Sequence, residues 1–347
     1  MNDNTITKNK SLGIKFIAVL LMIMLHTFAF PDRISNVEYT SIFILNGLPI
    51  EYYIGRLGSI CVGMFTFLSG YGLYISYSRN INYKGIFKRI YNIYLNYWIV
   101  FLIFIPIGIV MNRYSVDMKE LLLNFIGLKD TYNGEWWFLR LYIMLLLLYP
   151  ILIKIINKYN KNSIIILSFL INIGGYGLTK ITYIIGINSV IISSIVLVLG
   201  GQFLFILGII VAKYGLFDWL KIKLKFSRLM GIVSLIGIIL IMLVTVDVPV
   251  IGEVLKLIFI PIFIFILAIV INKNSKLAIL GKHSTNMWLT HSFFCYYLFQ
   301  KFTFASKYSI LILAQQVIVT IIISIMINKM ITFMKNTSIK NKAEVSG

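Results

Sequence analysis

The sequence predicts an all-α membrane protein with about ten transmembrane helices. Of its 347 residues, 59% are hydrophobic and only 13% are charged, whereas soluble domains carry about 25% charged residues. Apolar runs long enough to cross a bilayer recur along the chain, such as SVIISSIVLVLGGQFLFILGIIVA at 189–212. These runs lack the polar positions at a 3.6-residue period that a soluble helical bundle needs on its outer face. The composition therefore excludes a soluble globular protein.

Apolar windows along the chain give the positions of the expected spans. The first segment has no small-residue cleavage site and is followed by PDRISNVEYTS, so it is expected to remain as a helix rather than be removed as a signal peptide. The fifth is short and ends in NIGGYG, whereas the eighth and tenth follow the long runs LIFIPIFIFILAIVI and ILILAQQVIVTIIISIMI. The ten spans are expected at 12–30, 57–78, 90–111, 137–156, 163–179, 190–212, 229–246, 254–272, 283–300 and 309–331.

The charges between these spans predict the orientation of the chain. If the N-terminus is cytoplasmic, the inner segments hold 22 of the 32 basic residues and only three of the 12 acidic ones. Every inner loop is then net basic, as the positive-inside rule requires. Both termini are therefore expected in the cytoplasm. The net charge of +20 follows from this topology, together with attraction to anionic lipid headgroups, and implies no nucleic-acid partner.

The chain is expected to form a single integral-membrane domain over residues 1–347, with no soluble domain. The longest segments outside the spans are about 31–56 and 112–136 on the outer side and 213–228 on the inner side. Cys61 and Cys295 both lie in apolar segments and are interpreted as buried small hydrophobes. Because no zinc spacing, Walker loop or G-x-G-x-x-G pattern occurs, no metal or nucleotide motif is predicted.

His26 is the leading candidate for chemistry, because ionisable groups inside a span are costly and usually functional. Lys15 lies 11 residues before it, close to three helical turns, so both side chains share one helix face about 16 Å apart along the axis. Two simpler interpretations stay open. Lys15 is also an ordinary orientation signal for a helix that starts in the cytoplasm, and His26 is also suited to a buried hydrogen bond with a neighbouring helix.

The spacing from Lys15 to His26 resembles the Arg-x10-His pattern of the integral-membrane acyltransferase 3 family, which O-acylates cell-surface glycans. Five further segments resemble that family in the expected order, and the similarity covers about residues 10–335. They are GSICVGMFTFLSGYGLYIS, FKRIYNIYLNYW with Arg89, EWWFLRLYIMLLLLYP with Trp137 and Tyr149, GGQFLFILGIIVAKYGLF, and LGKHSTNMWLTHSFF with His291. Two positions depart from the pattern. The first-span arginine is Lys15, which keeps the charge but loses the planar fork of a guanidinium, and the arginine expected three residues after Arg89 is Asn92.

The resemblance implies a membrane O-acyltransferase that moves an acyl group, most often acetyl, from cytoplasmic acetyl-CoA or another acyl-CoA to a sugar hydroxyl of a surface or lipid-linked glycan. His26 would act either as the base that deprotonates the hydroxyl or as a transient carrier of the acyl group. Lys15, Arg89 and Lys88 would hold the CoA phosphates. An extended pantetheine arm is comparable in length to the axial gap between Lys15 and His26.

Other residues have simpler interpretations beside their functional ones. His291 lies midway along the ninth span and is suited equally to packing and to the site. Glu135 and Trp137 lie at the outer interface, where aromatic residues anchor helices or stack on an acceptor sugar. Ser69 lacks the strand-turn context of a nucleophile elbow and is interpreted as a small packing residue. Arg140 is expected to snorkel or to pair with an outer carboxylate such as Glu135.

Two other classes of polytopic membrane protein fit the sequence less well than an acyltransferase. A transporter or flippase for lipid-linked sugars would carry more charges inside the spans and usually an internal repeat, and the sequence shows neither. A polysaccharide polymerase would carry a large outer loop rich in arginine, whereas the longest outer segments hold only Arg33, Arg56 and Arg113. Both alternatives are therefore less favoured than acyl transfer.

Overall fold

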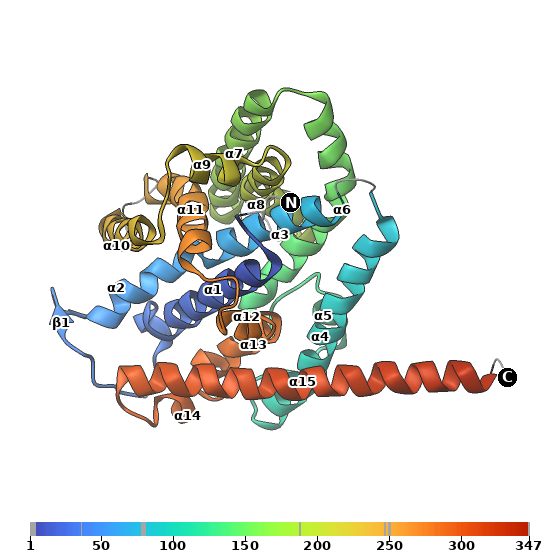
Figure 1. Cartoon of the computed structure of the whole chain (residues 1–347). Helices are drawn as coiled ribbons and strands as arrows, with labels where there is room; N and C mark the ends of the chain where they lie inside the picture. The colour runs from blue at the N-terminus through green and yellow to red at the C-terminus, as the bar shows by residue number, and fades with distance from the viewer. Residues whose placement is uncertain are drawn as a thin grey trace.

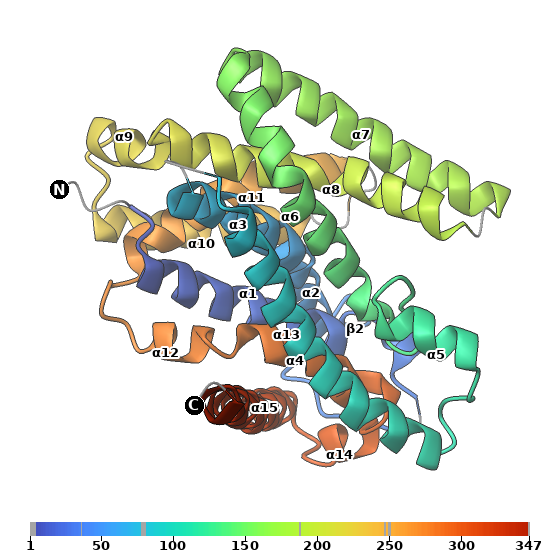
Figure 2. The ribbon, with the colours of Figure 1, turned by 90° about the vertical axis from the view of Figure 1, so that its right-hand side faces the viewer.

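The computed structural model describes residues 5–35, 37–77, 81–186, 189–245, 248 and 251–345, with side chains described up to residue 337. Within these ranges the chain forms α-helices and one short antiparallel hairpin, so the prediction of an all-α membrane protein is confirmed. The ends of the expected spans at residues 78 and 246 lie outside the described residues. Figures 1 and 2 show the helices as one bundle, with α15 along one edge.

In this part of the chain, nine helical segments are long and apolar enough to cross a membrane. They are α1 (Lys8–Phe28), the continuous segment of α2 (Ile50–Arg56), η2 (Leu57–Ile60) and α3 (Cys61–Tyr77), α4 (Tyr83–Val110), η3 (Gly134–Trp136) with α6 (Trp137–Lys158), α7 (Lys161–Ile185), α8 (Val190–Lys213), α10 (Arg228–Thr245), α11 (Ile251–Val270) and α15 (Ser309–Val345). The short helix α9 (Leu216–Lys223) connects α8 to α10.

The expected span at 283–300 is helical but divided into short pieces. These are α13 (Ser284–Ser292), the π-helical turn η4 (Phe293–Tyr297) and the first residue of α14 (Gln300–Phe304), and the short helix α12 (Leu277–Gly281) precedes them. In η4 the Phe293 carbonyl accepts hydrogen bonds from the backbone N–H groups of Leu298 and Phe299, at 2.9 and 2.8 Å. A π-helical turn inserts one residue into a helix and turns the following side chains, and such turns are frequent at functional sites. Buried α13 and η4 lie inside the bundle against α1.

Helix α1 lies at the centre of the bundle. It begins at the N-cap Thr7, whose hydroxyl accepts a hydrogen bond from the Lys10 amide. It is packed against α2, η2 and α3 on one side and against α12 and α13 on another. A Cβ on Gly281 of α12 would come within 2.0 Å of the Leu12 carbonyl oxygen, so only glycine allows this close approach. The position of His26 near the end of α1 is therefore fixed from several sides.

Helices α3 and α8 form a closely packed pair beside α1. A Cβ on Gly70 of α3 would lie 2.0 Å from the Phe205 carbonyl oxygen, and a Cβ on Gly208 of α8 would lie 2.2 Å from the Phe67 carbonyl oxygen. Small residues let helix backbones approach in this way in membranes, where dispersion contacts replace the hydrophobic effect as the main attraction between helices. Helix α3 also supplies one wall of the cavity at Lys15 that is described below.

The two longest segments that the charge pattern predicts to lie on the outer side contain short regular elements. After η1 (Pro31–Arg33), strands β1 (Ile44–Leu45) and β2 (Leu48–Pro49) form a hairpin whose turn residues Asn46 and Gly47 have φ of 48° and 79°, as an Asn-Gly turn favours. The second segment holds α5 (Met118–Phe125), capped by the carboxylate of Asp117. It leads into η3, which carries Glu135 towards the end of α1.

Candidate active site

His26 lies in a cluster of polar side chains at the end of α1. Its Nε2 is 3.1 Å from Oε2 of Glu135, and its Nδ1 is 3.4 Å from the hydroxyl of Tyr296. The Tyr296 hydroxyl also donates a short hydrogen bond to the other oxygen of Glu135. The exposed fractions of the His26 and Glu135 side chains are only 10% and 12%, so the pair is largely shielded from solvent. The three residues come from α1, η3 and η4.

Arg33 supplies a positive charge at the more open side of this cluster. Its Nη1 donates to Oε1 of Glu135 at 3.0 Å and to the Tyr296 hydroxyl at 2.9 Å, and the guanidinium lies over the rings of Phe30 and Tyr296. The carboxylate of Glu135 thus has charged or polar partners on both oxygens. A buried carboxylate is retained in its ionised form only with such partners.

His291 of α13 lies on the other side of His26, with ring centroids 5.0 Å apart. Its Nδ1 is 2.7 Å from the Trp288 carbonyl oxygen, which can only accept a hydrogen bond, so this nitrogen carries the proton. The Nε2 atom is then an acceptor, and it is buried without a hydrogen-bond partner. The structure therefore brings His26, Glu135 and His291 together.

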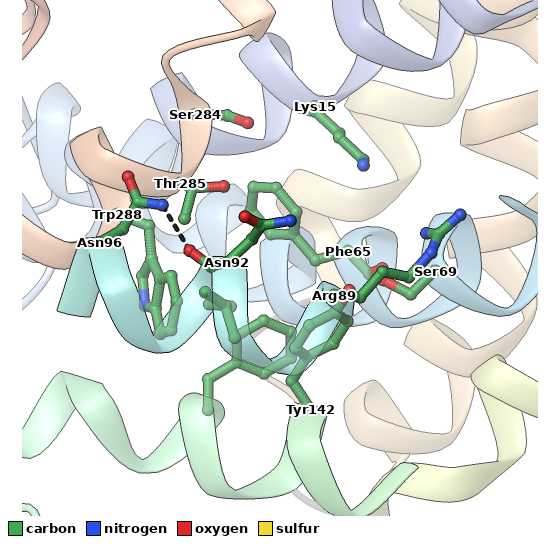
Figure 3. Close-up of a pocket in the computed structure, with 12 residues that line it drawn as sticks. Lys15, Phe65, Ser69, Arg89, Asn92, Asn96, Tyr142, Ser284, Thr285 and Trp288 are labelled. Atoms are coloured by element: carbon green, nitrogen blue, oxygen red, sulfur yellow. Dashed lines mark hydrogen bonds between the residues drawn. The ribbon is translucent and has the colours of Figure 1, made fainter. Parts of the chain in front are cut away.

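Lys15 and Arg89 lie at a separate cavity of about 250 Å³ between α1, α3, α4, α6 and α13. Figure 3 shows Lys15 on α1 across this cavity from Arg89 and Asn92 on α4. Arg89 is oriented by hydrogen bonds from its Nε to the Tyr77 hydroxyl, at 3.1 Å, and from its Nη2 to Ser76 Oγ, at 2.9 Å.

Trp288 connects this cavity to the His26 cluster. Its ring lines the cavity, its Nε1 is 3.4 Å from the Glu135 carbonyl oxygen, and its own carbonyl oxygen accepts the His291 hydrogen bond. Trp288 thus contacts both the cavity that holds Lys15 and Arg89 and the cluster that holds Glu135 and His291.

Comparison with known proteins adds an independent observation. Residues 12–329 match the model of the acyltransferase 3 family, described as an acyltransferase domain. The chain belongs to this family. No curated protein and no solved structure matches it. The protein is therefore an acyltransferase with a multi-pass membrane arrangement, and the resemblance seen in its sequence motifs is confirmed.

The acyltransferase has a lysine close to the position where the family pattern has its second α4 arginine. Asn92 occupies that position and lines the cavity, and Nζ of Lys335 donates a hydrogen bond of 3.0 Å to its Oδ1. Lys335 belongs to α15, 243 residues further along the chain. It adds a positive charge beside Asn92, on the same helix as Arg89. No pattern in the sequence indicates this contact, because it depends on the packing of α15 against α4.

The other predicted residues of the acyltransferase take different positions. Lys88 is exposed and does not line the cavity beside Arg89. Trp137 lines another cavity of about 260 Å³, together with Thr66, Asn172 and Thr179. Ser69 lines the Lys15 cavity, and its hydroxyl donates to the Phe65 carbonyl oxygen of its own helix, at 2.7 Å.

Arg140 pairs with a carboxylate, as expected, but this carboxylate belongs to Asp130 and not to Glu135, which was the example given. Arg140 Nη2 lies 3.8 Å from Oδ2 of Asp130, and its Nη1 donates to the Leu128 carbonyl oxygen at 2.5 Å. The side chain points from α6 towards the loop after α5, whereas the Glu135 carboxylate is directed at α1. Arg33 and Tyr296, which do contact Glu135, were not singled out from the sequence.

Proposed function

We propose that this acyltransferase moves an acyl group, most often acetyl, from acyl-CoA to a hydroxyl of a cell-surface or lipid-linked glycan. The observation that supports this best is the contact of His26 with Glu135 at one end of α1, while Lys15 on the same helix faces a cavity with Arg89. A base for the acceptor hydroxyl, His26, and one cation for the donor phosphates, Lys15, thus lie on one helix, about 16 Å apart along its axis, and Arg89 of α4 adds a second cation at the same cavity.

The carboxylate of Glu135 selects the reactive nitrogen of His26. A carboxylate beside Nε2 stabilises the tautomer that carries its proton there, so Nδ1 keeps its lone pair. Nδ1 lies 3.4 Å from the Tyr296 hydroxyl, which is long for a hydrogen bond. An acceptor hydroxyl next to Tyr296 would be within reach of this nitrogen.

Two routes of transfer use this arrangement. In the direct route, Nδ1 takes the proton of the sugar hydroxyl while its oxygen attacks the thioester carbonyl, and CoA leaves as a thiolate that then takes the proton from His26. In the covalent route, Nδ1 attacks the thioester carbonyl, the C–S bond breaks and CoA leaves as a thiolate. The sugar hydroxyl then attacks the acyl group on Nδ1, and its proton passes to the CoA thiolate as the bond from Nδ1 to the acyl group breaks. Positive charge forms on the imidazole in both, next to the Glu135 carboxylate.

In this proposal, the donor binds to the cations at and near the Lys15 cavity. Lys15, Arg89 and Lys335 would contact the phosphates of CoA, and Lys88 would add positive charge at the exposed side of α4. The pantetheine arm would pass Trp288 and bring the thioester to His26. On the acceptor side, the indole of Trp137 offers a face on which a sugar can stack.

The proposal is tested with purified protein in liposomes. The liposomes are supplied with acetyl-CoA labelled in the acetyl group and with surface glycan isolated from the cells that produce this protein. Transfer of label to the glycan by the wild type, with loss of at least 10²-fold in His26→Gln, is the expected result. Label on the protein after acetyl-CoA alone would select the covalent route. Glycan that gains no label, while its length or its distribution across the membrane changes, would refute acyl transfer.

A further inference from the structure

A cationic cavity lies where the ends of α1, α9, α10 and α11 meet, away from the His26 site. It has a volume of about 310 Å³ and is lined by Lys10, Lys221, Arg228 and Lys273, and none of the described residues that line it is acidic. Lys10 also donates a hydrogen bond of 2.6 Å to the Ala268 carbonyl oxygen near the end of α11. Since these cations lie at the ends of membrane-length helices, the cavity is at the depth of the lipid headgroups.

The positive charge of this cavity is not neutralised by the acid nearest in sequence. Asp218 is the only acidic residue between 213 and 228, and its Oδ1 accepts hydrogen bonds from the backbone N–H and the hydroxyl of Thr5, at 2.5 and 2.6 Å. Within the ranges that the structure describes, neither Lys221 nor Arg228 forms an ion pair. Lys221 and Arg228 therefore present positive charge to the cavity with no ion-pair partner among the described residues.

A second, apolar cavity of about 650 Å³ adjoins the cationic one between α8, α9, α10 and α11. The two have neighbouring residues as walls: Leu220 of α9 lines the apolar cavity, and Lys221 lines the cationic one. Leucine, isoleucine and phenylalanine side chains make up most of the apolar lining. Its rim is open towards the bilayer, since the exposed fractions of Leu224, Ile241 and Ile262 are 50%, 52% and 44%.

We propose that the two cavities together bind one anionic phospholipid. The headgroup phosphate lies among Lys10, Lys221, Arg228 and Lys273, and an acyl chain lies between α9, α10 and α11. Charge complementarity selects this occupant, because basic pockets between membrane helices bind anionic headgroups and the adjoining apolar space suits a hydrocarbon chain. This site is independent of the proposed transfer reaction and lies on the face that the charge pattern predicts to be cytoplasmic.

The headgroup part is tested by native mass spectrometry of the full-length protein in detergent, with phosphatidylglycerol and phosphatidylcholine of the same acyl chains. We expect the wild type to retain phosphatidylglycerol preferentially, and Lys221→Gln with Arg228→Gln to lower its retention about tenfold or more. The matched control is Lys154→Gln with Lys158→Gln, two exposed lysines of α6 that line neither cavity. Equal retention of both lipids by the wild type, or an equal loss in the control, would overturn the proposal.

The acyl-chain part is tested by filling the apolar cavity. A Cβ on Gly237 of α10 meets no atom within 4 Å, so Gly237→Leu adds volume there without a clash. We expect it to lower phosphatidylglycerol retention severalfold, while Gly174→Leu, at an open position on α7, leaves it unchanged. Glycerol 3-phosphate is the probe for a free phosphate. If it displaces phosphatidylglycerol at equal concentration, or if Gly237→Leu has no effect, the site does not recognise a lipid.

Discussion

Replacing Glu135 by glutamine keeps the size of the side chain and removes its charge. In the native site, Oε1 accepts hydrogen bonds from Arg33 and Tyr296, and Oε2 faces Nε2 of His26. The amide oxygen of glutamine can replace Oε1, which leaves the NH2 group facing His26. Because two donors cannot bond each other, His26 must then move its proton from Nε2 to Nδ1. The nitrogen that acts as the base or nucleophile is lost.

The expected fall in kcat follows from the loss of a correctly oriented base. A positioned base contributes about 10²–10⁴-fold, so kcat should fall by that factor, equivalent to about 3–5.5 kcal/mol in the barrier. The KM for acetyl-CoA should stay within about threefold, because Glu135 does not line the Lys15 cavity. Release of CoA thiol in the presence of acceptor glycan measures both constants, and thermal unfolding in detergent checks that the variant is folded.

The matched control is Glu120→Gln. Glu120 lies on α5, outside the His26 cluster, and its carboxylate is paired with Lys129. This variant should leave kcat unchanged. If Glu135→Gln is folded and its kcat falls by less than about tenfold, the carboxylate does not orient His26, and the tautomer argument is refuted.

Three further variants test the donor cavity and the packing of the fold. Lys335→Gln should raise the KM for acetyl-CoA about three- to tenfold with little change in kcat, since the lost charge is partly solvated. The double variant Lys335→Gln with Asn92→Arg should restore the KM. A KM that Lys335→Gln leaves unchanged would show that Lys335 does not bind the donor. Lys15→Ala should likewise raise this KM while Lys15→Arg is tolerated, and equal loss in both would indicate a packing role. Gly70→Ala should lower the free energy of unfolding by about 1–3 kcal/mol, because its Cβ meets the α8 backbone. Gly72→Ala is the control, since its Cβ meets nothing within 4 Å, and it should leave the free energy of unfolding unchanged. Equal unfolding temperatures for the Gly70→Ala and Gly72→Ala variants would contradict the packing of α3 against α8.

Much of the fold follows from composition and periodicity alone, since a bilayer permits few structures other than helices of sufficient length. The expected span at 283–300 is the exception. Its residues are apolar enough to suggest a continuous helix, but the structure divides them and forms the π-helical turn η4, which directs Tyr296 at His26. This turn depends on packing inside the bundle, and a local hydropathy pattern does not contain that information.

Like the fold, the candidate site was predictable from the sequence only in part. His26 and Lys15 were recognisable because a charge or an imidazole inside an apolar run is unusual and their spacing spans three helical turns. Their partners come from distant parts of the chain: Glu135 lies 109 residues beyond His26, and Lys335 lies 243 residues beyond Asn92. Glu135 was suspected only from its place at the outer interface. Such contacts are set by how helices pack, which one sequence does not reveal.

The central claim is that His26 is the base or transient acyl carrier in the transfer of an acyl group to a glycan. Mass spectrometry of surface glycans tests it most directly, in cells that lack the gene and in cells complemented with the wild type or with His26→Ala. The account predicts an acetyl-sized or other acyl mass that only the wild type restores, with the His26→Ala protein present in the membrane at a normal level. Restoration of that mass by His26→Ala, or a change in glycan length or amount without any acyl difference, would contradict it.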